Sequence, residues 1–249
     1  MGSIRFIVGA ALAAVLWHGA ALVRAADDAE RTQAVLQVLR ALRGGGHVLV
    51  VTHGAVTDGE RDDPTARADD CARQQALSDF GRLAASGLGK LLGRLQVPVD
   101  SIVSSDYCRA VEVAQRIADG TRTRHLSKLD ALNESAAVPP AVAHARAMAL
   151  SNLVSARPAA RSNLLLVTHR SNVSQAFNVD ASAVGDGELW VFKPLPGTSP
   201  PGRPNGEHRR AQPEGTSMSH ELVERVRLSE LSAAMHSLNA RAASASTAP

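Results

Sequence analysis

The chain has 249 residues, of which 45% are hydrophobic and 20% charged. This composition supports a globular domain with a buried core and excludes a disordered or fibrous protein. Aromatic residues make up only 3% of the chain and the net charge of +3 comes from scattered arginines, so no nucleic-acid partner is expected.

The N-terminus has the pattern of a secretory leader. Arg5 precedes a mostly apolar run over residues 6–17, and residues 23–25 offer small side chains at the cleavage positions. We therefore expect residues 1–25 to be a signal peptide and the protein to be exported, as a periplasmic or secreted protein. The alternative is an uncleaved leader that anchors the chain in a membrane, because the weakly polar stretch approaches spanning length.

A short helix and a glycine linker are predicted over residues 26–45. Apolar side chains recur on one face from Asp27 to Leu42, and a helix does not continue through the three glycines that follow. Residues 46–194 are the expected folded domain. Residues 195–249 are the expected linker and tail.

The domain begins with a buried strand. Residues 47–51 are apolar and rich in β-branched side chains, which is typical of a strand covered on both faces. The strand ends at Thr52-His53-Gly54, and a loop rich in Asp, Arg, Gly and Pro follows to about residue 76.

Helices and strands alternate along the rest of the domain. In chain order they are a helix capped by Ser78, a strand over 101–104, a helix over about 107–120, a strand near 125–132, a helix over about 140–154, a strand over 163–168, a helix over 172–177 and a strand over 188–192. This alternation predicts an α/β fold. Its sheet is mainly parallel with helices on both faces, and ligands bind at the carboxyl ends of the strands.

The composition changes beyond Pro194. Residues 195–216 are rich in Pro, Gly, Ser, Arg and Glu and cannot bury enough apolar surface to order themselves. Helical spacing returns over residues 218–243 and predicts a peripheral helix, either without a partner or as a contact for another protein chain.

Two histidines follow buried strands directly. His53 comes after the first strand and His169 after the strand over 163–168, and neighbouring strands of a sheet lie about 5 Å apart. Arg109 opens the helix after the strand over 101–104, so its guanidinium is expected near the same edge. This group suits a tetrahedral phosphate, because arginine donates to its oxygens while one neutral imidazole acts as nucleophile.

Four short motifs surround these residues. They are VTHG at 51–54, LSDFGR at 77–82, SSDYCRA at 104–110 and VTH at 167–169. Together they resemble the Arg-His-Gly signature, the Leu-(Ser/Thr)-x-x-Gly segment, the Ser-x-x-x-(Cys/Ala)-Arg-Ala segment and the second histidine of the histidine phosphatase superfamily, the phosphoglycerate mutase-like proteins. The resemblance covers residues 46–194 and implies a three-layer α/β fold.

The resemblance also implies a hydrolase of small phosphomonoesters that needs no metal and no cofactor. His53 would attack phosphorus and become a phosphohistidine, while Arg109 and His169 hold the equatorial oxygens. Glu134 is the expected acid for the leaving group, with Asp130 as the alternative.

The chain departs from this family at the first arginine, which is Thr52 here. A charge-assisted hydrogen bond is worth about 1.5–3 kcal/mol against about 1 for a neutral one, so phosphate affinity should fall. Thr52, Gly54, Arg73 and Arg170 are the expected phosphate-binding residues, with Arg73 or Arg170 restoring the charge. Two functions remain open: a slow exported phosphatase, and a catalytically impaired descendant that serves as a phosphate-binding or envelope interaction module.

The chain has two cysteines, Cys71 and Cys108. In an oxidising compartment they are a candidate disulfide, and two free thiols are the alternative. Neither cysteine has a spaced partner for zinc and there is no His-Glu-x-x-His motif, so no metal site is expected.

Overall fold

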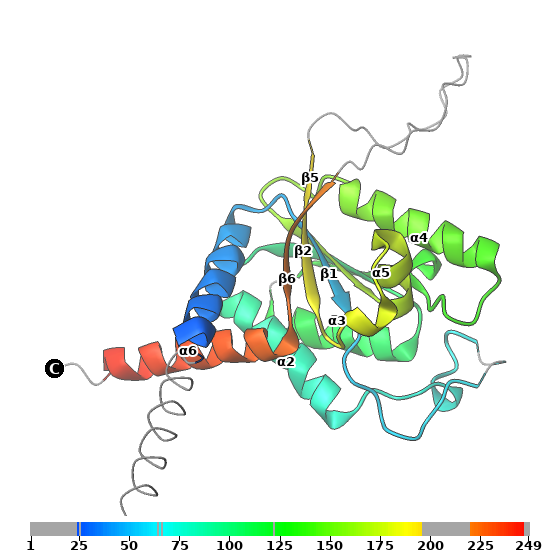
Figure 1. Cartoon of the computed structure of the whole chain (residues 1–249), viewed down its shortest axis with the longest axis horizontal. Helices are drawn as coiled ribbons and strands as arrows, with labels where there is room; N and C mark the ends of the chain where they lie inside the picture. Colours follow the sequence, from blue (N-terminus) through cyan, green and yellow to red (C-terminus); the bar gives the residue numbers. More distant parts are fainter. Residues whose placement is uncertain are drawn as a thin grey trace, which may run out of the picture.

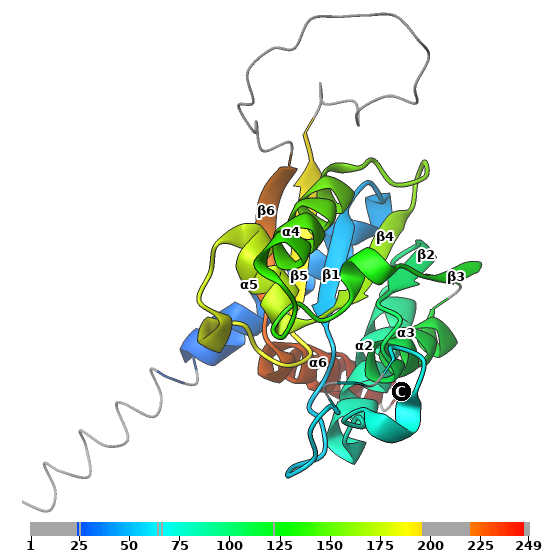
Figure 2. The same cartoon turned by 90° about the vertical axis from the view of Figure 1, so that its right-hand side faces the viewer.

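The computed structural model describes residues 24, 26–63, 65, 67–121, 123–195 and 220–246. These form a sheet of six strands with helices on both faces (Figures 1 and 2). The strand order is β3-β2-β4-β1-β5-β6, with bounds β1 Val48–Thr52, β2 Val99–Ser104, β3 His125–Lys128, β4 Asn163–Thr168, β5 Leu189–Pro194 and β6 His220–Val226. β5 pairs antiparallel with β1 and β6, and the other pairs are parallel. The expected mainly parallel α/β sheet is confirmed.

Two layers of helices cover the sheet. One layer contains the N-terminal helix (residues 26–41), α2 (Asp79–Arg94), α3 (Cys108–Gly120) and α6 (Leu228–Ser246), and the other contains α4 (Pro140–Ser155) and α5 (Arg170–Phe177). Residues 48–51 of strand β1 are all apolar because they contact helices on both faces of the sheet. Leu49 and Val51 pack into the first layer, whereas Val48 and Val50 pack into the second.

The C-terminal segment corrects the helix expected over residues 218–243. Residues 220–226 form strand β6, and the helix begins only at Leu228. β6 pairs with β5 from Val226 opposite Leu189 to His220 opposite Pro194. The free backbone groups of β5 provide hydrogen bonds that outweigh the helical spacing of the segment.

The expected N-terminal helix is present and packs into the core. Its Leu36 and Leu39 are fully buried with the sheet residues, and each buried leucine contributes about 1.5–3 kcal/mol. Arg31 joins this helix to the C-terminal segment through Glu224 at 3.1 Å and Glu230 at 2.8 Å. The folded unit therefore extends beyond residues 46–194 at both ends.

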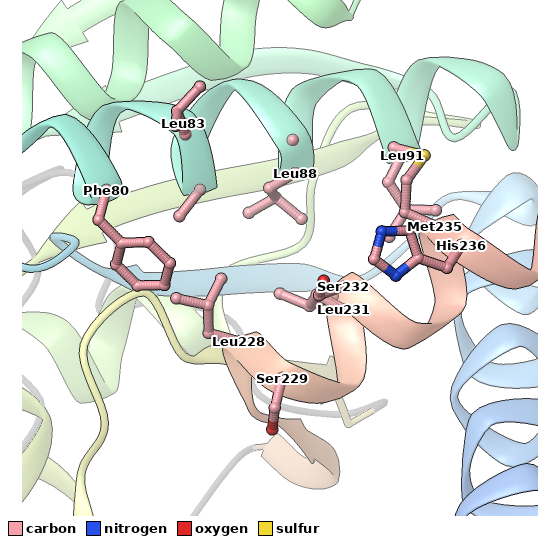
Figure 3. A pocket seen from close by; sticks show the side chains of 12 residues that line it. Phe80, Leu83, Leu88, Leu91, Leu228, Ser229, Leu231, Ser232, Met235 and His236 are labelled. Carbon is pink, nitrogen blue, oxygen red and sulfur yellow. The ribbon is translucent and has the colours of Figure 1, made fainter. Parts of the chain in front are cut away.

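An apolar groove of about 440 Å³ lies between α2 and α6 (Figure 3). Phe80 and Leu83 of α2 line it and are 62% and 72% exposed, and Leu228, Leu231 and Met235 line it from α6. None of the expected site residues lines this groove.

Some expectations fall on residues that are not described. The leader residues 1–23 and 25 and most of the linker, residues 196–219, lie outside the described residues. Within the described part of the chain, no helix is long and apolar enough to span a membrane.

Candidate active site

The ends of β1 and β4 bring the two histidines together. These strands are parallel, with Thr52 opposite Thr168, and His53 and His169 follow them directly. The centroids of the two imidazole rings lie 5.1 Å apart. Arg109, in the first turn of α3, is 4% exposed and lies near the same pair. The expected convergence of His53, His169 and Arg109 is therefore present.

The start of α2 holds the loop that follows His53. The Ser78 hydroxyl accepts a hydrogen bond from the Gly81 amide at 3.1 Å and donates one to the Ala55 carbonyl at 2.9 Å. A Cβ atom on Gly81 would lie 2.3 Å from the Ala55 oxygen, so only glycine permits this close approach. The Leu-Ser-x-x-Gly motif thus fixes the backbone beside the first histidine.

A contact with the backbone fixes the tautomer of His53. Its Nδ1 lies 2.9 Å from the Gly54 carbonyl oxygen. A carbonyl can only accept, so Nδ1 carries the proton and Nε2 the lone pair. Burial, together with the nearby His169 and Arg109, lowers the pKa of His53 to about 3. The imidazole is therefore neutral at neutral pH. Gly54, expected to bind phosphate, instead fixes the tautomer of His53 through its carbonyl.

A chain of hydrogen bonds fixes His169. The Asp106 amide donates to Asn133 Oδ1 at 2.7 Å, and the Ser105 hydroxyl donates to the same oxygen at 2.9 Å. Ser105 has one hydroxyl proton, so His169 Nε2 must donate to Ser105 Oγ at 2.8 Å. The other nitrogen, Nδ1, is buried without a hydrogen bond and lies 3.3 Å from Glu134 Oε2.

Glu134 lies against both His169 and Arg109. Its Oε1 accepts hydrogen bonds from the Ser171 hydroxyl and from the amides of Ser135 and Ala136. Burial raises the pKa of Glu134, but His169, Ser171 and the Ala136 amide together hold it well below its usual range. Burial also lowers the pKa of His169, against the attraction of Glu134. Glu134 is therefore ionised, and its Oε2 lies against the one ring nitrogen of His169 that has no hydrogen-bond partner.

The guanidinium of Arg109 is already bound by a carboxylate of the chain. Its two terminal nitrogens donate to the two oxygens of Asp62 at 2.8 and 2.9 Å, and one of them lies 3.7 Å from Glu134 Oε2. Asp62 is a site residue that was not expected. The charges of Arg109, Asp62 and Glu134 sum to −1 (one positive, two negative), which opposes the entry of a phosphate dianion.

Thr52 does not face this pocket, which corrects its expected role in binding phosphate. It is fully buried, and its hydroxyl donates to the Gly185 carbonyl at 2.7 Å and accepts from the Glu188 amide at 3.1 Å. Successive side chains of a strand point to opposite faces, so Thr52 is directed into the turn before β5 while His53 reaches the pocket.

Arg73 and Arg170 do not restore the missing charge, and this expectation was wrong. Arg73 is 46% exposed and bound to Asp63 at 2.6 Å. Arg170 donates to the Ala181 carbonyl at 3.0 Å, and its guanidinium lies 3.7 Å from Asp186. Arg73 is thus paired with a carboxylate of its own loop, and Arg170, at the start of α5, lies near a carboxylate of the turn before β5.

Cys71 and Cys108 form a disulfide, with their Cα atoms 5.5 Å apart. The bridge joins the loop between β1 and α2 to the residue before Arg109. It closes 37 residues of chain, which corresponds to about 4 kcal/mol of lost entropy in the unfolded state. The loop that carries Asp62 is thereby held close to Arg109.

Two comparisons with known proteins find no match, and a third finds similar solved structures. No protein-family model matches the sequence, and a search of curated proteins finds no match. Solved phosphatase structures are similar to it. They include the protein histidine phosphatase SixA complexed with tungstate (13% identity, TM-score 0.47, 74% of this chain and 99% of SixA), SixA from Agrobacterium tumefaciens (14%, 0.46, 73% and 97%) and a mycobacterial glucosyl-3-phosphoglycerate phosphatase (18%, 0.43, 60% and 91%). At these identities and scores, the geometry of the site has to carry the functional proposal.

Proposed function

We propose that the chain hydrolyses phosphomonoesters through a phosphohistidine at His53. The orientation of His53 carries this proposal, because the Gly54 carbonyl holds the proton on Nδ1 and leaves the Nε2 lone pair free. The ring is neutral and lies beside a second imidazole and an arginine. The four sequence motifs point to the same chemistry.

The reaction has two steps. In the first, His53 Nε2 bonds to phosphorus, the ester P–O bond breaks, and Glu134 gives a proton to the leaving oxygen. Glu134 is ionised in the free protein, so it has to take up this proton as the substrate binds. In the second step, water attacks phosphorus, Glu134 accepts a proton from the water, and the N–P bond breaks to release phosphate and neutral His53.

Asp62 makes this reaction slow. A substrate phosphate must displace the Asp62 carboxylate before Arg109 can donate to its oxygens. A charge-assisted pair of this kind is worth about 1.5–3 kcal/mol, so substrate affinity falls by roughly ten- to hundredfold.

The test is hydrolysis of an aryl phosphate by the protein without residues 1–25, in the presence of a chelator. We expect His53→Ala to abolish turnover and the parent to give an acid-labile phosphohistidine on rapid quenching. His144→Ala removes an exposed histidine of α4 and is the matched control, with activity unchanged. Turnover that is indifferent to His53 would contradict the mechanism.

A second candidate function is a non-catalytic binding module. Two observations favour it: Thr52 points away from the pocket, and Arg109 is bound by Asp62. If neither the parent nor Asp62→Ala hydrolyses the ester, but Asp62→Ala binds inorganic phosphate, this second function is supported instead.

Export is part of the proposal. The leader pattern and the Cys71–Cys108 bridge both suit an oxidising compartment. Mass spectrometry of the unreduced protein from cell fractions should give a chain that begins at Ala26 with the bridge intact. An intact leader in the membrane fraction would support the anchor instead, and a reduced chain in the cytoplasm would contradict export.

A further inference from the structure

Three side chains of the pocket present metal-ligand atoms to one another. One such atom from each of His53, Glu134 and His169 lies within 4.8 Å of the other two. The available imidazole nitrogens are His53 Nε2 and His169 Nδ1, because the other nitrogen of each ring is hydrogen-bonded elsewhere. The available carboxylate atom is Glu134 Oε2.

The surroundings of both imidazoles are those of metal ligands. A ligand histidine usually donates its second ring nitrogen to a fixed acceptor, which sets its tautomer and orientation. His53 Nδ1 donates to the Gly54 carbonyl, and His169 Nε2 donates to Ser105, whose own proton goes to Asn133. Both lone pairs are thus fixed before any ligand binds.

The contact between His169 Nδ1 and Glu134 Oε2 is suited to a bound cation. His169 Nδ1 is fully buried and has no hydrogen-bond partner, and it lies 3.3 Å from a carboxylate oxygen. A buried ring nitrogen and a carboxylate oxygen at this distance need a proton or a metal ion between them. Asp62 neutralises Arg109, so a divalent cation would enter a pocket whose formal charge is −1.

We propose that this pocket binds a divalent transition metal ion, with Zn²⁺ the best fit, through His53 Nε2, His169 Nδ1 and Glu134 Oε2. Two imidazoles and one carboxylate are a known ligand set for zinc, and they leave a fourth position for water or an anion. Mg²⁺ and Ca²⁺ prefer all-oxygen ligands and should not compete.

Metal binding and phosphohistidine formation exclude each other. Both use the single lone pair on His53 Nε2, so the bound ion should inhibit phosphomonoester hydrolysis competitively. This inhibition rests on the proposed function, whereas the binding itself does not.

The experiment is a calorimetric titration of Zn²⁺ into the full chain, stripped with a chelator and free of any affinity tag. We expect one ion per chain, at least tenfold weaker binding in His53→Ala and in Glu134→Gln, and unchanged binding in His144→Ala. Co²⁺ should give the visible absorption of a tetrahedral site in the parent and lose it in the two site variants. Circular dichroism checks that each variant is folded.

Two results would overturn the proposal: no heat and no absorption band at micromolar metal, or binding that neither site variant weakens. The outcome is separate from that of the esterase assay. Zinc binding without hydrolysis removes the phosphohistidine proposal and leaves the metal site in place. Hydrolysis without zinc binding removes the metal site and leaves the phosphohistidine proposal in place.

Discussion

The two halves of the pocket differ in what fixes them. The histidine half is set by hydrogen bonds at the strand ends, where Gly54 orients His53 and Ser105 orients His169. The cationic half depends on a long loop, because Asp62 from that loop occupies Arg109. The two imidazoles are therefore fixed from the edge of the sheet, whereas the guanidinium of Arg109 is paired by a loop outside the sheet.

The largest expected effect comes from releasing the loop. Replacing both Cys71 and Cys108 by serine removes the 37-residue closure and should lower the free energy of unfolding by about 4 kcal/mol. Urea unfolding of the oxidised parent and the double variant measures this difference. Adding a reductant to the parent should reproduce the loss, and a parent that is insensitive to reductant would contradict it.

The second-largest effect is expected from acid, which should destabilise the histidine half of the pocket. The folded pKa of His53 is about 3, below the unfolded value of about 6.5, so the unfolded state binds the extra proton as pH falls. His53 thus contributes stability above pH 6.5 that is lost on acidification, by about 2 kcal/mol between pH 6.5 and 4.5. Denaturant unfolding with a chelator should show this slope in the parent and a shallower one in His53→Asn, while His144→Ala keeps the parent slope.

Freeing the arginine should strengthen phosphate binding. Asp62→Ala removes the carboxylate that competes for Arg109, and we expect inorganic phosphate to bind about thirtyfold more tightly, or about 2 kcal/mol. Asp63→Ala is the matched control, since Asp63 is adjacent but pairs with Arg73. Equal phosphate affinities in the two variants would show that Asp62 does not compete with phosphate for Arg109.

The smallest effect is expected at Thr52. Thr52→Val keeps the shape but removes the hydroxyl that bonds to Gly185 and Glu188. It should cost about 1 kcal/mol of stability and leave phosphate affinity unchanged, which thermal unfolding and calorimetry can measure together. A loss of phosphate affinity would return Thr52 to the binding site.

The sequence predicts the parts of the site that depend on local structure. Apolar runs define β1 and β4, and the residue after each run is a histidine, so the meeting of His53 and His169 follows from parallel pairing. The motif over 104–110 adds Arg109, and the family resemblance adds Glu134 with Asp130 as its alternative; the structure places Arg109 and Glu134 at the pocket. These features depend on the local order of residues, which can be read from the sequence.

The remaining features depend on contacts between distant segments. Asp62 lies in a loop that also contains Asp58, Glu60 and Asp63, and no periodicity distinguishes the acid that reaches Arg109. β6 is recognisable only through its pairing with β5, across residues 196–219. The direction of Thr52 depends on the face of β1 that the turn at Gly185 covers. Tertiary contacts of this kind override local preference.

The ion pairs of Arg31 with Glu224 and Glu230 affect how the protein folds during synthesis. Arg31 meets Glu230 across 199 residues, so this corner of the fold cannot close until residue 230 has left the ribosome. Until then β5 is an edge strand with unpaired backbone groups, the kind of edge that associates with other chains. Nascent chains that stop after Pro194 should therefore aggregate rather than accumulate as a smaller folded protein.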